Sequence, residues 1–199
     1  MAFAFPSPLY VIVDADAAGR AGWTVPACAA ACLDAGARLL QVRAKAAPAR
    51  DMLTWAEDIR RLCESYPDVL VFVNDRVDVA VAADLPYVHV GQDDLPAVEV
   101  RGLLGEEGRI GLSTHTRVQV EAACQAPVDY IAMGPVFGTE TKDTGYEAVG
   151  LERVRMAVDV VQAAGLSWKK RWTTSSAMPS ATRRGANCVL MNRNPGPPP

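Results

Sequence analysis

Three polar side chains alternate with small apolar residues in the segment Gln41-Val42-Arg43-Ala44-Lys45. In an extended chain every second side chain points to the same side, so one amide and two cations would share a face. Guanidinium and ammonium groups fixed in this way are suited to binding phosphate oxygens. We predict that this segment binds an anionic group such as pyrophosphate. The alternative is an exposed strand end that carries ordinary surface charges.

Acidic and amide residues follow the next two apolar segments. Asn74 and Asp75 come directly after Val69–Val73, and Asp94 follows Tyr87–Val90. Carboxylates from adjacent strands can reach one hard cation, and Mg²⁺ is commonly held by one or two carboxylates together with phosphate oxygens of a substrate. We therefore predict that Asp75 and Asp94 bind Mg²⁺. The alternative is that one of these residues simply caps the following helix.

Later segments add hydroxyl groups, imidazoles and one more cation. Ser113 and His115 follow the apolar run Arg109–Leu112, whereas His89 lies inside an apolar run and is predicted to be packed or hydrogen-bonded. A glycine-containing loop after the sixth apolar run can wrap phosphate through backbone N–H groups and hydroxyls. This loop supplies Thr139, Thr141 and Lys142. The combined set of anion binders and a carboxylate pair predicts a site for pyrophosphate and Mg²⁺.

The elements that must position these residues alternate between strand and helix. Continuous apolar runs are typical of parallel strands covered on both faces, and they predict strands at Leu9–Val13, Arg38–Val42, Val69–Val73, Tyr87–Val90, Arg109–Leu112 and Val128–Ala132. Helical periodicity and capping residues predict helices at Thr24–Ala35, Pro48–Ser65, Val77–Ala83, Leu95–Leu104, Thr116–Cys124 and Leu151–Ala164. Such alternation requires a parallel sheet with right-handed crossovers.

Two α/β architectures satisfy this alternation, an open doubly wound sheet and a closed (β/α)8 TIM barrel. Polar residues follow the strand in at least five of the units, and in a barrel all these strand ends meet at one rim. The sequence has no GxGxxG after its first strand, which argues against a dinucleotide-binding open sheet. We therefore predict the barrel.

The motifs at the strand ends resemble those of thiamine phosphate synthase, and they occur in the order of that family. The matching motifs are Gln41-x-Arg43-x-Lys45, Asn74-Asp75-Arg76, Gly91-Gln92-x-Asp94, Gly111-x-Ser113-x-His115, and Gly134-Pro135-Val136-Phe137 with Thr139-x-Thr141-Lys142. The resemblance covers Leu9 to about Leu166. It implies a transferase of thiamine biosynthesis that joins hydroxymethylpyrimidine pyrophosphate to hydroxyethylthiazole phosphate, giving thiamine phosphate and pyrophosphate, with Mg²⁺ as cofactor.

The resemblance also implies roles for single residues. The side chains that would hold the pyrimidine substrate are Gln41, Arg43, Lys45, Asn74, Ser113 and Lys142. Thr139 and Thr141 would meet the thiazole phosphate, and Asp75 and Asp94 would bind Mg²⁺. Pyrophosphate would leave first, and the thiazole nitrogen would capture the resulting cation. The expected catalytic side chains are Arg43, Lys45, Ser113 and Lys142, of which the three cations neutralise charge on the leaving group.

Two alternative functions remain open. Thiazole tautomerases share the barrel but use a histidine for proton transfer, and His115 is the residue that keeps this interpretation open. A tautomerase does not need the two carboxylates or the Gln/Arg/Lys strand, which favours the synthase. The second alternative is a non-catalytic remnant of the barrel.

Composition argues against several other classes of protein. The residues before Ser167 carry 14 basic and 23 acidic side chains, a net charge of −9 that disfavours nucleic acid as a partner. No apolar run approaches the ~20 residues that span a bilayer, so we expect no membrane partner. The five cysteines lack CxxC spacing and fit free thiols, and the N-terminus lacks the pattern of a secretory signal. We expect a cytoplasmic enzyme that acts on small molecules.

The pattern changes abruptly after Leu166. Six basic and no acidic residues follow, in a segment rich in Trp, Ser, Asn and Pro, and only Cys188–Met191 could form a strand. We predict a barrel domain over residues 1–166 that is truncated after the sixth β/α unit. Residues 167–199 would be a poorly ordered tail, produced by a shift of the reading frame near residue 166.

The tail prediction has an alternative and a consequence. The alternative is a functional basic tail that binds an anionic partner. The consequence is that two strands, and the glycine-rich turns that hold the thiazole phosphate in the family, would be missing. The edges of the first and sixth strands would then be exposed, which favours aggregation or association into a homo-oligomer.

Overall fold

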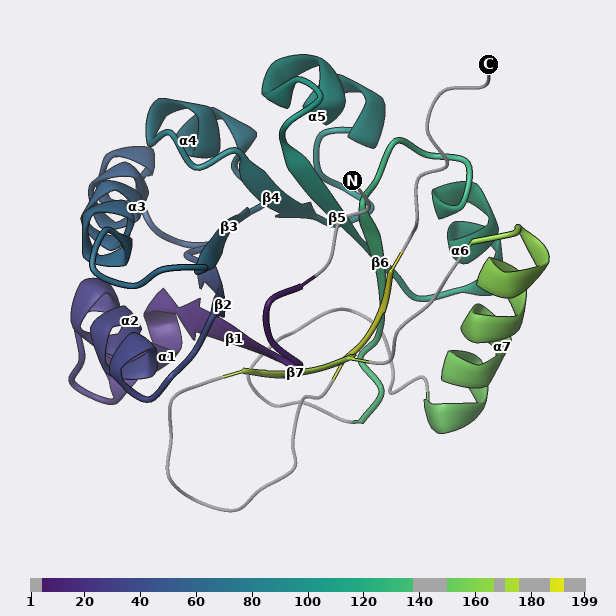
Figure 1. The fold of residues 1–199 in the computed structure, drawn as a ribbon, viewed down its shortest axis with the longest axis horizontal. Helices are drawn as coiled ribbons and strands as arrows, with labels where there is room; N and C mark the ends of the chain where they lie inside the picture. Colours follow the sequence, from purple (N-terminus) through teal and green to yellow (C-terminus); the bar gives the residue numbers. More distant parts are fainter. Residues whose placement is uncertain (1–4, 138–149, 167–170, 176–186, 192–199) are drawn as a thin grey trace.

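Six strands, each followed by at least one helix, make up most of the described chain (Figure 1). The computed structural model describes residues 5–137, 150–166, 171–175 and 187–191. The strands are β1 (Leu9–Asp14), β2 (Leu39–Arg43), β3 (Leu70–Asn74), β4 (Tyr87–Val90), β5 (Arg109–Thr114) and β6 (Tyr130–Met133). The helices are α1 (Ala15–Arg20), α2 (Val25–Asp34), α3 (Ala49–Cys63), α4 (Val77–Ala82), α5 (Ala97–Leu104), α6 (Arg117–Ala123) and α7 (Gly150–Ala163). The six predicted strands and six predicted helices are confirmed, and α1 is an additional short helix that the sequence analysis did not predict.

The first six strands pair in sequence order, and every one of these pairs is parallel. Figure 1 shows the helices arranged outside the ring of strands. Because the six strands are parallel, their carboxyl ends meet on one side of the sheet. The predicted α/β fold of six parallel strands is therefore confirmed.

Two further strands, β7 (Arg171–Ser175) and β8 (Asn187–Met191), close the ring. Strand β7 is parallel to β1, whereas β8 runs antiparallel to both β6 and β7. The expectation that the first and sixth strands have exposed edges is wrong, because β7 and β8 cover those edges. With these edges paired, exposed strand edges no longer favour self-association. In the described part of the chain neither closing strand is followed by a helix.

The two closing strands differ in how well the sequence predicts them. Strand β8 contains the apolar segment Cys188–Met191, which is the one strand predicted in this region. Strand β7 is not predicted, because its sequence Arg-Trp-Thr-Thr-Ser has no continuous apolar run. Trp and Thr nevertheless favour extended structure. The division into a domain over residues 1–166 and a tail over 167–199 stays a prediction.

Local capping interactions set the ends of several helices. The Thr24 hydroxyl accepts a hydrogen bond from the Ala27 N–H at the start of α2, and Gly36 follows the helix with a φ of 91°. The sequence predicts both residues as the limits of this helix. Thr116 and Gln119 form a reciprocal capping box at the start of α6. The Asp14 carboxylate caps α1 by accepting from the Ala17 N–H at 2.9 Å, which ties the end of β1 to that helix.

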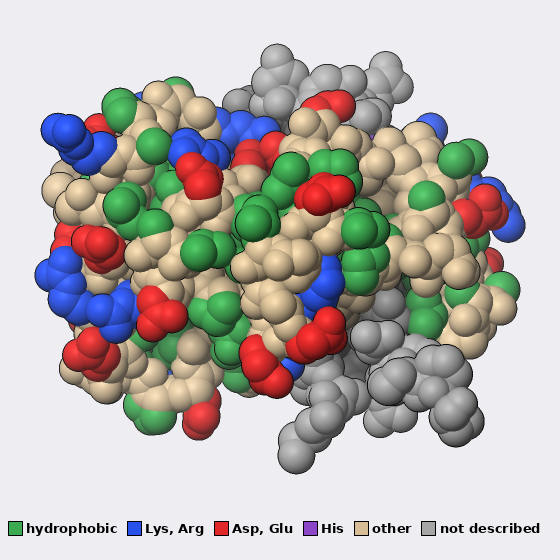
Figure 2. Space-filling model, turned by 90° about the horizontal axis from the view of Figure 1, so that it is seen from above, with side chains coloured by type: hydrophobic (Ala, Val, Ile, Leu, Met, Phe, Trp, Pro, Cys, Tyr) green, Lys and Arg blue, Asp and Glu red, His purple; other side chains and the backbone are tan. Residues whose placement is uncertain are grey.

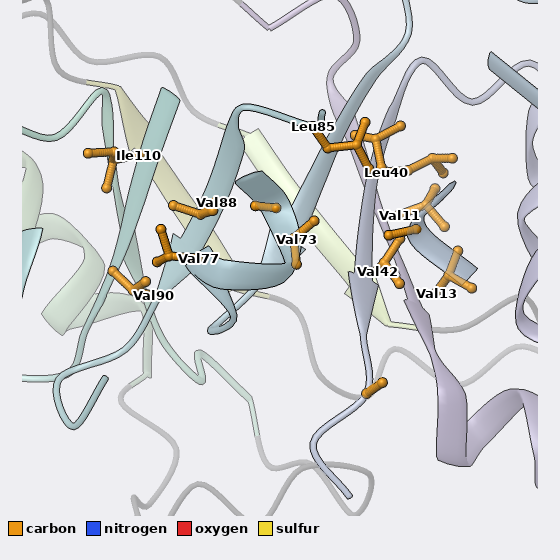
Figure 3. Packing of buried hydrophobic residues seen from close by; sticks show 14 of the residues in the cluster. Val11, Val13, Leu40, Val42, Val73, Val77, Leu85, Val88, Val90 and Ile110 are labelled. Atoms are coloured by element: carbon orange, nitrogen blue, oxygen red, sulfur yellow. The ribbon is translucent and has the colours of Figure 1, made fainter. Parts of the chain in front are cut away.

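The strands bury both of their faces, as their continuous apolar sequences predict. Valine, leucine and isoleucine side chains pack between the strands and the helices, and Figure 3 shows part of this layer, including Val11, Leu40, Val73, Val88 and Ile110. The opposite face lines the inside of the ring, where a separate aromatic cluster lies. It contains Phe5, Tyr10, Phe72 and Tyr130, whose ring centroids are 5.0 to 6.2 Å apart.

The outer surface near α4 and α5 is partly apolar. Figure 2 looks onto the side of the molecule where these helices lie, and hydrophobic side chains are interspersed there with charged ones. A pocket of about 380 Å³ lies between the two helices and is lined by Val77, Asp78, Val81, Ala82, Leu95 and Leu103. Its lining is almost entirely apolar, so it lacks the groups that would carry out chemistry. Among the described residues, no helix has the length and apolar character needed to cross a bilayer.

Candidate functional site

Strand β2 directs two polar side chains toward β1. Arg43 lies opposite Asp14 in the register of these strands, and the two side chains form an ion pair in which both are almost fully buried. Gln41, two residues earlier, donates from Nε2 to the hydroxyl of Tyr10 at 3.0 Å. The buried Nε of Arg43 has no hydrogen-bond partner among the described residues. The end of β2 therefore offers an N–H donor and a fixed positive charge, the chemistry that binds an anion.

Lys45 and the two predicted metal ligands come together beside this strand end. The Nζ of Lys45 is 3.3 Å from Oδ2 of Asp75, and the Asp94 side chain is within hydrogen-bonding reach of Asp75. Asp94 is itself held in place, because its Oδ2 accepts from the Gly91 N–H at 2.7 Å. Residues that are 19 positions apart in the chain thus form one carboxylate pair next to a cation.

The backbone at Asp75 adopts a conformation that few residues accept. Its φ is 62°, in the left-handed region that Asp and Asn tolerate better than most residues with a side chain. The Asp75 N–H donates to the carbonyl of His89 at 2.9 Å, which fixes the turn after β3 against β4. This turn places the carboxylate at the end of the strand, where it faces Asp94.

The electrostatics of the carboxylate pair favour a bound cation. Burial raises the pKa of Asp75, the hydrogen bond and the negative charge of Asp94 raise it further, and Lys45 partly offsets these effects. A divalent cation would offset the burial and mutual repulsion of the two negative charges by binding both carboxylates. The described residues contain no group of three or more His, Cys, Asp or Glu side chains that could hold a metal. The donor set is therefore two carboxylates, which suits Mg²⁺ because that ion takes further oxygens from water and phosphate.

Removing the Asp75 charge should stabilise the metal-free protein at neutral pH. The folded state binds the Asp75 proton more tightly than the unfolded chain does, so stability falls as pH rises from 3.8 through the raised pKa. An asparagine side chain at this position has no such proton and tolerates the same backbone conformation. In EDTA at neutral pH we therefore expect Asp75→Asn to melt at a higher temperature than wild type, by about 2–4 °C for each kcal/mol gained.

Thermal unfolding over a pH series measures this difference, which should vanish well below pH 3.8. Asp78 provides a control of opposite sign, because its hydrogen bond to Arg76 lowers the pKa of the Asp78 carboxyl. Asp78→Asn should leave the protein no more stable than wild type at neutral pH. An Asp75→Asn protein that melts below wild type in EDTA at neutral pH would contradict the prediction.

A third group of polar side chains lies inside the ring of strands. His89 on β4 makes two hydrogen bonds: its Nδ1 lies 2.7 Å from the Tyr130 hydroxyl oxygen, and its Nε2 lies 2.8 Å from the Ser113 hydroxyl oxygen. The prediction that His89 is hydrogen-bonded is confirmed. Ser113, at the end of β5, is thereby tied to the interior on one side. Its backbone carbonyl accepts from Gln92 Nε2 at 2.6 Å, which links it to the turn that carries Asp94.

Two other predicted residues are buried near the same strand ends. Asn74 is the last residue of β3, is 6% exposed and directly precedes Asp75 in the chain. His115 follows β5, and its Nδ1 is hydrogen-bonded to the carbonyl of Gly134 at the end of β6. This hydrogen bond fixes the position of the His115 ring. The remaining predicted site residues, Thr139, Thr141 and Lys142, lie outside the described residues.

The sequence analysis missed three residues that the structure places at this site. Asp14 follows the apolar run of β1 directly, which is the same signal that identified Asn74 and Asp75, and it pairs with Arg43. In the sequence, Tyr10 and Tyr130 resemble ordinary apolar residues of their strands. In the structure their hydroxyl oxygens are 3.1 Å apart in the interior. A phenol on the inward face of a strand could have been flagged, because a buried hydroxyl needs a hydrogen-bond partner.

Comparison with known proteins gives one consistent family. The family model described as thiamine monophosphate synthase matches residues 9–168. The thiamine-phosphate synthase of Koribacter versatilis is 42% identical over 149 residues, which are 74% of this chain and 70% of that protein. The thiamine-phosphate synthase of Methanosarcina barkeri is 38% identical over 130 residues, 65% of this chain and 58% of that protein.

A solved structure agrees with these sequence matches. The thiamine phosphate pyrophosphorylase from Pyrococcus furiosus has a TM-score of 0.65 and 30% identity, and the match covers 84% of this chain and 73% of that one. The match to the Methanosarcina barkeri protein spans less than two thirds of its length. Because the family model covers most of the chain, from β1 to the end of α7, the chain belongs to the thiamine monophosphate synthase family.

Proposed function

We propose that the chain is a thiamine-phosphate synthase that joins hydroxymethylpyrimidine pyrophosphate to hydroxyethylthiazole phosphate. The observation that carries the proposal is the Asp75–Asp94 pair beside Lys45, with Arg43 on the neighbouring strand end. Two carboxylates and two cations at the carboxyl ends of adjacent parallel strands match the needs of a magnesium pyrophosphate group. The names of the relatives support the same activity.

Asp75 and Asp94 would hold Mg²⁺, which supplies positive charge to the pyrophosphate leaving group when bound. Arg43 would donate from its unpartnered Nε to a phosphate oxygen, and Lys45 would turn from Asp75 toward the same group. These interactions strengthen as negative charge builds on the departing pyrophosphate, so they stabilise the transition state. No side-chain nucleophile is required, because the thiazole nitrogen captures the pyrimidine-methyl cation.

The other substrate contacts of this proposal follow from the family resemblance. Gln41, Asn74 and Ser113 would contact the pyrimidine substrate. The thiazole phosphate would be bound by Thr139 and Thr141, and Lys142 would lie near the pyrophosphate. The fold would be the (β/α)8 barrel of the family with its last two β/α units replaced by β7 and β8. We attribute that replacement to an altered reading frame after about residue 166, close to where the family match ends.

The tautomerase alternative has less support. His115 is 9% exposed, and its Nδ1 is engaged with the Gly134 carbonyl. The carboxylate pair is suited to Mg²⁺, and the cations are suited to pyrophosphate. A proton transfer on the thiazole ring involves neither of these groups. The synthase therefore accounts for more of the described polar residues.

An assay of the condensation tests the proposed function. Purified full-length chain is incubated with pyrimidine pyrophosphate, thiazole phosphate and Mg²⁺, and thiamine phosphate is followed by chromatography. We expect product that disappears when EDTA is added or when either substrate is omitted. Folded protein that gives no product would show that the chain is a non-catalytic member of the family.

A further inference from the structure

A continuous chain of hydrogen bonds crosses the inside of the ring of strands. It begins at Gln41, whose Nε2 donates to the Tyr10 hydroxyl at 3.0 Å, and that hydroxyl is 3.1 Å from the Tyr130 hydroxyl. The Tyr130 hydroxyl is 2.7 Å from His89 Nδ1, and His89 Nε2 is 2.8 Å from the Ser113 hydroxyl. Side chains from β2, β1, β6, β4 and β5 thus form one connected row that ends at the rim.

All members of this row are buried, so every proton in it needs an acceptor. Tyr10 is 2% exposed and Tyr130 is fully buried, and burial raises the pKa of both phenols. Both therefore remain neutral and carry a single proton. A neutral phenol can donate one hydrogen bond, and a neutral imidazole donates from one ring nitrogen and accepts at the other.

These rules leave one order in which the protons of both phenols and of the imidazole all have an acceptor. Gln41 donates to Tyr10, so the Tyr10 proton must go to Tyr130, and the Tyr130 proton must go to His89 Nδ1. The imidazole then carries its own proton on Nε2 and donates it to the Ser113 hydroxyl. In the reverse order Tyr10 would accept from both Gln41 and Tyr130, and its own proton would have no acceptor among the described residues.

We propose that this row holds His89 as the Nε2–H tautomer and thereby directs the Ser113 hydroxyl proton away from His89, toward the rim. Tyr130 is the positioning residue, because its hydroxyl is the group that fixes which nitrogen of His89 carries the proton. Ser113 would therefore meet a ligand as a hydrogen-bond donor. The group it recognises is an acceptor atom, such as an unprotonated ring nitrogen or a carbonyl oxygen.

The fold makes specific room for Tyr130 at this place. A Cβ at Gly111 would lie 2.0 Å from Cζ and 2.3 Å from the hydroxyl oxygen of Tyr130. Gly111 is the partner of Tyr130 in the register of β5 and β6. Only a residue without a side chain allows the phenol to reach His89, so the glycine and the tyrosine act together.

The tautomer can be read directly from histidine ¹⁵N shifts. The chain contains two histidines, His89 and His115, so a ¹⁵N-histidine-labelled full-length sample gives a simple spectrum in which the second residue is an internal reference. At a pH where the imidazole is neutral, we expect His89 Nε2 to be protonated and Nδ1 to be unprotonated. The Nδ1–H tautomer in the wild-type protein would overturn the proposal, whatever any variant shows.

Tyr130→Phe removes the hydroxyl and keeps the ring in its place. We expect the His89 signals to move toward a mixture of tautomers, because Nδ1 loses its donor. Tyr87→Phe is a matched control, since its ring contacts Phe72 in the same aromatic cluster and its hydroxyl is not part of the row. If Tyr130→Phe does not fold, Tyr10→Phe replaces it. This variant should shift the ratio of the two His89 tautomers less than Tyr130→Phe would. A tautomer that is unchanged in a folded Tyr130→Phe protein would also overturn the proposal.

A kinetic readout separates this inference from the proposed function, on which the choice of substrate rests. With pyrimidine pyrophosphate as the varied substrate, we expect Tyr130→Phe to raise KM about five- to tenfold with a smaller change in kcat. An unchanged KM beside a shifted tautomer would refute the donor role of Ser113 toward this substrate. If the wild-type chain has no synthase activity, the proposed function fails and the NMR measurement alone decides the inference.

Discussion

Replacing Gly111 with alanine is expected to destabilise the protein by about 3 kcal/mol, the upper part of the range for overpacked cores. The new methyl group would lie within 2.5 Å of three atoms of the Tyr130 ring and hydroxyl. Tyr130 is fully buried among Phe5, Tyr10 and Phe72 and cannot swing away without breaking this cluster. Urea unfolding followed by circular dichroism measures the change as a lower midpoint at an unchanged slope.

Gly102→Ala is the matched control for this substitution. Gly102 lies within α5, and a Cβ there would meet nothing within 4 Å. Alanine favours a helix over glycine, so this variant should be stabilised by about 0.5–1 kcal/mol. The two glycine-to-alanine changes should thus have opposite signs. A Gly111→Ala protein as stable as wild type would mean that Tyr130 does not occupy the interior position described here.

Asp94→Asn is expected to lower the Mg²⁺-dependent rate of thiamine phosphate formation by about 100-fold or more, because the cation loses one of two carboxylates. Asparagine has nearly the same shape, and its carbonyl oxygen can still accept from the Gly91 N–H that Asp94 holds at 2.7 Å. The turn should therefore persist while the charge is lost. Initial rates at a series of Mg²⁺ concentrations measure the effect.

Asp93→Asn removes the same charge one residue earlier. Asp93 is exposed, and no described ion pair involves it, so its replacement should change the rate little. Comparison of the two variants separates the effect of losing the charge at position 94 from the effect of changing the net charge of the molecule. Equal rates in the Asp94→Asn and wild-type proteins would exclude Asp94 as a metal ligand.

The first six β/α units could be predicted because their signals are local. Val71–Val73 is an apolar run typical of a strand covered on both faces, and Leu39–Val42 is such a run interrupted by Gln41 alone. Thr24 and Gly36 mark the ends of α2. The strand ends that carry Arg43 and Asp75 follow from the same runs. Parallel pairing then brings these residues to one side of the sheet without further information.

The parts that were missed depend on contacts between distant segments. Strand β7 pairs with β1 across more than 150 residues, and its own composition gives no periodic signal. The ion pair of Asp14 with Arg43 depends on the register of two strands. The Tyr10–Tyr130 contact joins residues 120 positions apart. Strand β7 and the Tyr10–Tyr130 contact depend on the closure of the ring, and the ion pair depends on the pairing of β1 with β2. A sequence pattern encodes neither of these locally.

The most direct test of the magnesium pyrophosphate site is calorimetric titration of pyrophosphate into the full-length chain, with and without Mg²⁺. This measurement does not depend on the thiazole half of the reaction. We predict binding that requires Mg²⁺ and that Asp75→Asn abolishes, since this substitution keeps the backbone conformation at φ 62° and removes one carboxylate. Pyrophosphate binding of equal strength in EDTA, or in the Asp75→Asn protein with Mg²⁺, would contradict the assignment.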